Sequence, residues 1–397
     1  MKRTLPALAL LLAVAGTTPA QPRPGTGPAF EETKYGVMPR PDELKDKKKK
    51  NESPDIAVFQ YTLINKNGVT LKCIDYGAII TELHVPDRNG KLADVVLGFD
   101  KLDDYRKGHP YFGTNAGRVA NRIANAKFKL EDKEYTVTKG NEKDAHTLHG
   151  GREGFDKKFW QGKASLTATG PSVTFKRTSP DGEEGYPGAL AAEVTYTLTD
   201  NNELVVDFRA TTTKTTLCNL AHHSYFNLSG HSAGDIKSHE VQIAAKNYTP
   251  ADETLIPSGK ISPVAGTPFD FTKAKAIGVD LVKAGGTPIG FDLNYVLDKG
   301  TTARPELAAR VTDPKSGRVL EVLSTEPGLQ FYTGNFLDGT NKGKGGAVYN
   351  QYNGFCMEPQ KFPNSINVPE WKDKSNVVLR PGETYKQTTV YQFGVAK

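Results

Sequence analysis

The stretch LVVDF at residues 204–208 is rich in β-branched and aromatic side chains and partly alternates between apolar and polar positions. This pattern is typical of a β-strand with one buried face. Turn signals such as DPKSG at 313–317 punctuate the chain. Many short strands divided by turns predict an all-β protein, a large antiparallel β-sandwich. Similar strand-like runs are VTLKC at 69–73, SVTFK at 172–176 and EVTYT at 193–197.

Long amphipathic helices are missing from the pattern. The best helical candidate, 272–283, is short and interrupted by glycine. No composition break that would mark a linker follows residue 55. We therefore expect residues 55–397 to form one β-sandwich domain, although that is long for a single domain.

The first twenty residues have the features of a signal peptide. Lys2 and Arg3 precede an apolar run at 5–16 that is too short to span a bilayer, and TPA at 18–20 offers a small-residue cleavage site. We expect cleavage near Ala20 and export to the periplasm or the extracellular space. A short membrane anchor is the alternative.

The segment 21–54 is rich in Pro, Gly and Lys. Loss of residues 1–20 lowers the net charge from +6 to +4, and much of the excess lies in KDKKKK at 45–50. Such a run can contact an anionic surface, but without an apolar period it favours a solvated, disordered extension. No basic stripe with interleaved aromatics follows, so we expect neither a nucleic-acid nor a membrane partner.

The three cysteines, Cys73, Cys218 and Cys356, are too few for a disulfide scaffold. Each lies in an apolar, strand-like run, where a free cysteine usually behaves as a small buried hydrophobe. One disulfide among them remains open.

The stretch LAHHSYFNL at 220–228 places polar side chains inside an apolar, strand-like run. Buried polar groups cost free energy unless they are paired or used, so this is a candidate functional segment. Side chains alternate along a strand, so His223 and Tyr225 share one face while His222 and Ser224 share the other. Only one of the two histidines can point into a given cleft.

Polar residues stand in unusual settings elsewhere, and most have an ordinary explanation. Arg122 could form a surface ion pair, His149 could satisfy a turn, Asp292 could brace a loop, and Gln330 could be a hydrogen-bonded strand residue. Glu358 is harder to explain in this way, because carboxylates are almost never fully buried unless they are paired or functional.

Several kinds of chemistry fit poorly. The sequence has no HxH or HExxH metal motif, no GxSxG elbow around Ser224, and no Gly-rich nucleotide loop after a strand. We expect no metal and no other cofactor. The remaining residues suit a sugar. They comprise one carboxylate, one histidine, polar side chains that can hydrogen-bond hydroxyl groups, and aromatic rings that can pack against the C–H groups. The possible metal ligands are His149, His222, His223, Asp292 and Glu358.

Ordered motifs over nearly the whole chain, from about residue 55 to 393, resemble those of the aldose 1-epimerase family, also called galactose mutarotases. Many motifs in the right order make the resemblance specific. They are GRVANRIA at 117–124, LHGG at 148–151, GFDK at 154–157, SPDGEEGYPG at 179–188, HSYFNL at 223–228, DETLIPSG at 252–259, GFDLNY at 290–295, LQFYTGNFLDG at 329–339 and the segment 355–367.

The resemblance implies a large antiparallel β-sandwich, with Glu358 as catalytic base and His223 as catalytic acid. One departure is His222, where relatives often have asparagine; we expect it to alter packing or a supporting hydrogen bond, and not the chemistry. The positions that match sugar-contacting residues of the family are Asn121, Arg122, His149, Asp292 and Gln330, and Tyr225 is expected to face the sugar beside His223.

The implied reaction is mutarotation of a free hexose, with galactose and glucose as the expected substrates. Glu358 takes the proton of the anomeric hydroxyl while His223 protonates the ring oxygen, and the opened aldehyde recloses as the other anomer. We expect a nearby carboxylate to keep His223 charged near neutrality. We also expect a monomer or weak dimer.

Three other functions stay open. A non-catalytic carbohydrate-binding protein could use the same scaffold, but the Glu358 and His223 pair is retained. A glycoside hydrolase usually needs two carboxylates, and only Glu358 and Asp292 could serve. A relative that acts on phosphorylated hexose fits an exported location poorly.

Overall fold

The computed structural model describes residues 27–41, 44 and 54–396. Strands dominate it, and its two α-helices, α1 (Leu102–Arg106) and α2 (Ile277–Asp280), are short, which confirms the all-β prediction. The helical candidate 272–283 forms only a two-residue strand and α2. The predicted signal peptide at 1–20 and the lysine-rich run at 45–50 lie outside the described residues.

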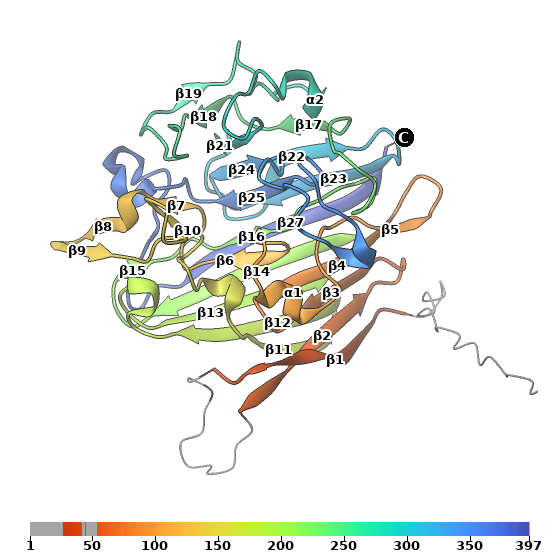
Figure 1. Cartoon of the computed structure of the whole chain (residues 1–397), viewed down its shortest axis with the longest axis horizontal. Helices are drawn as coiled ribbons and strands as arrows, with labels where there is room; N and C mark the ends of the chain where they lie inside the picture. The colour runs from red at the N-terminus through yellow and green to blue at the C-terminus, as the bar shows by residue number, and fades with distance from the viewer. Residues whose placement is uncertain (1–26, 42–43, 45–53, 397) are drawn as a thin grey trace, which may run out of the picture.

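Three sheets, each with antiparallel pairing throughout, form the body of the molecule (Figure 1). The first has the order β1 (Ala29–Pro39), β2 (Asp55–Ile64), β3 (Thr70–Ile74), β4 (Ile79–Pro86), β5 (Leu92–Asp94). The second has nine strands in the order β11 (Gln161–Thr167), β12 (Gly170–Ser179), β13 (Leu190–Leu198), β14 (Glu203–Thr212), β27 (Tyr385–Val395), β23 (Arg318–Ser324), β22 (Glu306–Thr312), β17 (Glu240–Ile243), β20 (Lys275–Ala276). The third has the order β19 (Ser262–Pro263), β18 (Asn247–Thr249), β21 (Asp292–Val296), β24 (Gly328–Tyr332), β25 (Cys356–Gln360).

Four two-stranded sheets accompany these three in the described part of the chain. One of them, β6 with β16, carries the two adjacent histidines on its second strand. The pairs are β6 (Thr114–Ala116) with β16 (Ala221–His223), β7 (Arg122–Ile123) with β10 (Thr147–Leu148), β8 (Lys127–Leu130) with β9 (Lys133–Thr136), and β15 (Thr216–Leu217) with β26 (Val378–Leu379).

The core lies between the sheets because the strands alternate as their sequences predict. In β14, Leu204, Val206 and Phe208 are buried, while the residues between them are partly exposed. Leu71 of β3 and Phe331 of β24 belong to the same buried cluster. All three sheets therefore share one hydrophobic core, as expected of a sandwich.

The prediction that residues 21–54 are a disordered extension is wrong over residues 29–39. These residues form β1, which pairs with β2 from Ala29 opposite Ile64 to Pro39 opposite Asp55. Most of β1 is exposed, Phe30 and Val37 included. The strand depends mainly on backbone hydrogen bonds to β2, so it lacks the apolar alternation by which a strand is recognised.

Cys73, Cys218 and Cys356 are all free and buried, which answers the question of a disulfide. Within the described ranges no helix has the length and apolar character needed to cross a membrane.

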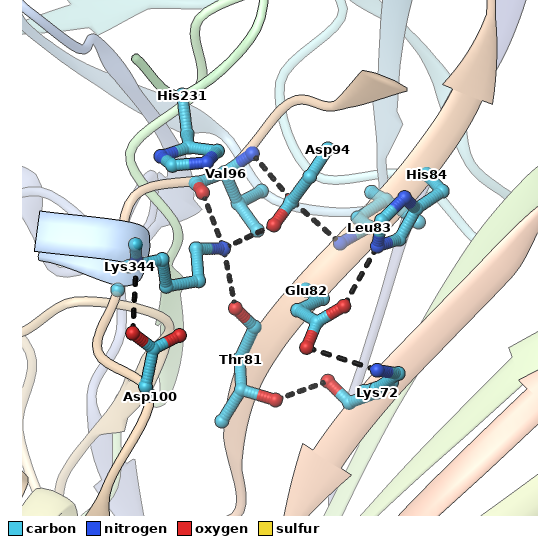
Figure 2. Close-up of polar contacts among 12 residues, drawn as sticks. Lys72, Thr81, Glu82, Leu83, His84, Asp94, Val96, Asp100, His231 and Lys344 are labelled. Atoms are coloured by element: carbon cyan, nitrogen blue, oxygen red, sulfur yellow. Dashed lines mark hydrogen bonds and ion pairs between the residues drawn. The ribbon is translucent and has the colours of Figure 1, made fainter. Parts of the chain in front are cut away.

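A buried ammonium ties the loop around Lys344 to the first sheet (Figure 2). Nζ of Lys344 donates to the carbonyl oxygens of Thr81 (2.6 Å) and Val96 (2.8 Å) and forms an ion pair with Asp94. The same loop carries Tyr349 towards the functional site. Its ring packs against that of Phe112, which in turn packs against Tyr225, with centroids 5.4 and 5.0 Å apart.

Candidate functional site

A cavity of about 500 Å³ opens where β16 and the third sheet meet the loops that follow β6 and β9. Its volume lies within the range of about 300–1,000 Å³ that is typical of small-molecule sites. Its wall contains all eight residues that the sequence analysis named for catalysis or binding, which are Asn121, Arg122, His149, His223, Tyr225, Asp292, Gln330 and Glu358.

Glu358 and His223 face each other across this cavity. Oε1 of Glu358 lies 3.6 Å from Nε2 of His223, and the two side chains are 2% and 5% exposed. Oε2 of Glu358 has no hydrogen-bond partner within the described part of the chain. An unpaired carboxylate oxygen this deeply buried is costly unless a ligand supplies its partner.

Burial governs the protonation of Glu358. It raises the pKa of the carboxyl group well above its ordinary value; the nearby carboxylate of Asp292 raises it further and Arg122 opposes the shift. The pKa of Asp292 is also raised by burial, while Arg122 and the hydrogen bond from Gln330 lower it.

The expectation that His223 is charged near neutrality is wrong for the unliganded site. Burial lowers the pKa of His223 to about 4. Burial disfavours the charged form of an imidazole. Burial also favours the protonated form of Glu358, and this weakens the attraction that its carboxylate would exert on an imidazolium.

The LHGG motif fixes His149 against Asn121. The backbone N–H of Asn121 donates to Nδ1 of His149 (3.2 Å), and the N–H of His149 donates to the carbonyl of Asn121 (3.0 Å). Gly150 has φ +98°, and a Cβ there would lie 1.8 Å from the carbonyl oxygen of Gly117, so only glycine fits. Burial and the neighbouring His223 hold the pKa of His149 low. The neutral ring therefore carries its proton on Nε2, as a donor for a ligand.

Gln330 and Asp292 lie on neighbouring strands of the third sheet. Nε2 of Gln330 donates to Oδ1 of Asp292 (2.6 Å), while Oε1 of Gln330 is buried without a hydrogen-bond partner among the described residues. Gln330 is also directly opposite Glu358 in the β24–β25 ladder. The sheet register thus aligns an amide and two carboxyl groups along one wall.

Aromatic rings also line the cavity, and sequence reasoning did not single out Tyr111 among them. Tyr111 packs against His149 and His223, with ring centroids 4.5 and 5.7 Å apart. Tyr225 lies against His223 at 5.2 Å, on the face that strand alternation predicted. The Tyr111 backbone has φ +63°, unusual for a bulky residue and frequent at functional sites. No sequence period marks such a residue.

His222 points away from the cavity, which confirms the predicted separation of the two histidines. Its Nε2 lies 2.6 Å from Oγ of Ser224 and its Nδ1 lies 3.2 Å from Oδ1 of Asn115. Burial lowers the pKa of His222 to about 3, so the ring is a neutral, fully bonded core residue.

Of the two arginines in GRVANR, only one reaches the cavity. Arg122 lines the cavity. Arg118 is 2% exposed and donates to Oγ of Ser179 (2.8 Å) and to the backbone carbonyls of Ser179, Pro180, Pro187 and Gly188. Arg118 therefore holds the SPDGEEGYPG loop and does not reach the site.

One part of the site has the donor set of a metal centre. His149, His223 and Glu358 bring ligand atoms within 4.8 Å of one another. Two imidazole nitrogens and one carboxylate oxygen together suit several transition metals. The same three atoms also suit a sugar, because they offer one donor and one proton-transfer pair to a single small ligand.

Comparison with known proteins gives one consistent result. The sequence profile of the aldose 1-epimerase family matches residues 60–392. The galactose mutarotases of Sus scrofa and Homo sapiens are each 50% identical over 323 residues, covering 81% of this chain and 90% of the relative. The aldose 1-epimerase of Escherichia coli (strain K12) is 37% identical over 350 residues, covering 86% of this chain and 99% of that protein.

Solved structures show the same similarity. A GalM/aldose epimerase homologue from C. elegans superimposes with a TM-score of 0.75 at 32% identity, covering 84% of this chain and 97% of that one. A galactose 1-epimerase from Lactobacillus acidophilus NCFM superimposes with a TM-score of 0.76 at 26% identity, covering 93% of this chain and 99% of that one.

Proposed function

This chain belongs to the aldose 1-epimerase family, and from that premise we propose that Glu358 and His223 carry the proton transfers by which it interconverts the α and β anomers of free hexoses. The protein is an isomerase that acts on a free sugar. We infer galactose and glucose as its substrates. The alternative of a non-catalytic carbohydrate-binding protein is not favoured.

One observation carries the assignment of roles. A carboxyl group and an imidazole, both buried, face the same cavity with Oε1 and Nε2 3.6 Å apart. Mutarotation needs one group that removes a proton and one that supplies it, both within reach of the ring oxygen and the anomeric hydroxyl.

Ring opening proceeds by two proton transfers. The carboxylate of Glu358 takes the proton of the anomeric hydroxyl, and a C=O bond forms at C1. The C1–O5 bond breaks, its electron pair goes to O5, and O5 takes the proton from Nε2 of His223. After rotation about C1–C2 both transfers run in reverse on the other face of the aldehyde, and the opposite anomer forms.

The surrounding residues position the sugar. Nε2–H of His149 donates to a hydroxyl, and the unpartnered Oε1 of Gln330 accepts from one. Asn121, Arg122 and Asp292 supply the remaining polar contacts, and Tyr225 offers an apolar face.

The protonation of the pair predicts the pH dependence. Burial raises the pKa of Glu358 and lowers that of His223 to about 4, so the pair holds one proton at pH values between these two pKa values. The reactive arrangement has that proton on Nε2. As pH falls through about 4 a second proton binds and the base is lost. We expect kcat/KM to fall on that acid side.

This prediction is checked by polarimetry between pH 3 and 9, after subtraction of the uncatalysed rate, with circular dichroism to show that the protein stays folded. An acid limb near the ordinary histidine pKa of about 6.5 would contradict the pKa direction assigned to His223.

The function itself is tested by polarimetry on freshly dissolved α-D-galactose and α-D-glucose. The protein is expected to accelerate the approach to the anomeric equilibrium. Binding of either sugar without acceleration would favour the carbohydrate-binding alternative and defeat the enzymatic one.

We further propose export and a monomeric or weakly dimeric state. The charged start, the apolar run at 5–16 and TPA at 18–20 support cleavage after Ala20. The mass of the exported protein should correspond to a chain that begins at Gln21. Sedimentation at increasing protein concentration tests the oligomeric state.

A further inference from the structure

Nδ1 of His223, the nitrogen that does not face Glu358, lies against a thiol. Sγ of Cys356 is 3.6 Å from this nitrogen, at hydrogen-bonding distance for sulfur, and Cys356 is fully buried. The imidazole is thus held between a thiol at Nδ1 and a carboxyl group at Nε2.

Both partners of the ring come from one strand. Cys356 and Glu358 are two residues apart in β25, so their side chains lie on the same face. The ladder with β24 fixes them opposite Tyr332 and Gln330. One strand, held in register by its ladder with β24, therefore sets both contacts to His223.

The proposed reaction determines which nitrogen keeps its proton. Nε2 gives a proton to O5 and later takes it back, so it must alternate between N–H and lone pair. The other ring proton then stays on Nδ1 in both states, and the sulfur of Cys356 accepts it. Burial raises the pKa of Cys356 well above its ordinary value, so the sulfur is an uncharged thiol.

A thiol is an unusual partner at this position. Catalytic histidines commonly donate Nδ1–H to a carboxylate or a carbonyl, which orients the ring and stabilises the imidazolium. Sulfur in a thiol is only a weak acceptor. It orients the ring but adds little stability to the charged form.

We propose that Cys356 is a positioning residue for mutarotation, which accepts Nδ1–H of His223 and thereby directs Nε2 towards Glu358 and the sugar. This inference rests on the acid role proposed for His223. Because the sulfur of Cys356 is a weak acceptor, it stabilises the imidazolium of His223 little. The imidazolium therefore remains a strong acid that gives up its proton readily to O5.

Two substitutions test the inference. Cys356→Ala removes the acceptor and is expected to lower kcat roughly tenfold through loss of ring orientation, with KM changed less than twofold. Cys356→Ser replaces sulfur by a stronger acceptor. It should restore most of kcat and move the acid limb of the pH–rate profile up by roughly half to one pH unit.

Cys218→Ala is the matched control, because Cys218 is likewise free and buried, whereas the thiol that lies against Nδ1 of His223 belongs to Cys356. It should keep the wild-type kcat and acid limb. A Cys356→Ala variant with wild-type kcat, or a Cys356→Ser variant whose acid limb is no higher than wild type, overturns the inference.

Nitrogen-15 NMR of the labelled histidines tests it without any change at Cys356. Above the acid limb, His223 should show the protonated Nδ1 and the bare Nε2; its signals are assigned by their loss in His223→Asn. A proton on Nε2 instead overturns the inference. Full activity of His223→Asn would contradict the acid role of His223. Wild-type kinetics in both Cys356 variants would contradict only the positioning role of Cys356.

Discussion

Glu358→Gln and His223→Asn are each expected to lower kcat for galactose mutarotation by about 10²–10⁴. Each change removes one of the two proton-transfer groups that lie 3.6 Å apart. The substitutes are close in size and keep hydrogen-bonding capacity, so KM should change far less than kcat. Because the two proton transfers belong to one ring-opening step, the double variant should lose little more than the worse single variant. Polarimetry with galactose measures all three.

The adjacent histidine provides a matched control. His222→Asn alters a residue that is equally buried but faces Ser224 and Asn115 on the other side of the strand. Its kcat should stay close to wild type after correction for the folded fraction. Equal losses in His222→Asn and His223→Asn would show that the strand, and not the facing imidazole, carries the effect. Full activity in Glu358→Gln would refute the assigned base.

The fold and the members of the site are predictable because both depend on short-range periodicity. Alternation along LVVDF places Leu204, Val206 and Phe208 in the core, as observed. The same rule separates His223 from His222, and the structure shows the two rings on opposite faces. The periodicity of a sequence does not show which distant strand lies opposite a given strand. The pairing of Glu358 with His223 therefore required the family resemblance or the structure.

The features that the sequence analysis did not predict depend on the tertiary environment of the residues. β1 gains its stability from backbone pairing with β2, which leaves no apolar signature in its own residues. The charge state of His223 follows from how completely the surrounding strands exclude water. Tyr111 and Cys356 resemble ordinary core residues, and only their contacts with His149 and His223 distinguish them.

The second large effect concerns stability. Lys344→Met is expected to lower the free energy of unfolding by about 3–5 kcal/mol, because it leaves the carboxylate of Asp94 buried without its counter-charge. The side chains of Lys344 and Asp94 are only 6% and 9% exposed. The carbonyl oxygens of Thr81 and Val96 also lose their donor. Urea unfolding followed by circular dichroism measures the change.

Two further variants separate the causes of this loss. Lys107→Met removes an exposed ion pair with Asp104, of 3.0 Å, and should cost no more than about 1 kcal/mol. The double variant Asp94→Asn/Lys344→Met no longer buries an unpaired carboxylate. If that charge causes the loss, the free energy of unfolding should partly recover in the double variant. The Lys344 loop carries Tyr349, whose ring contacts lead through Phe112 towards the site, so folded Lys344→Met should also lose activity. A Lys344→Met variant whose free energy of unfolding lies within about 1 kcal/mol of the wild-type value would contradict the buried-pair argument.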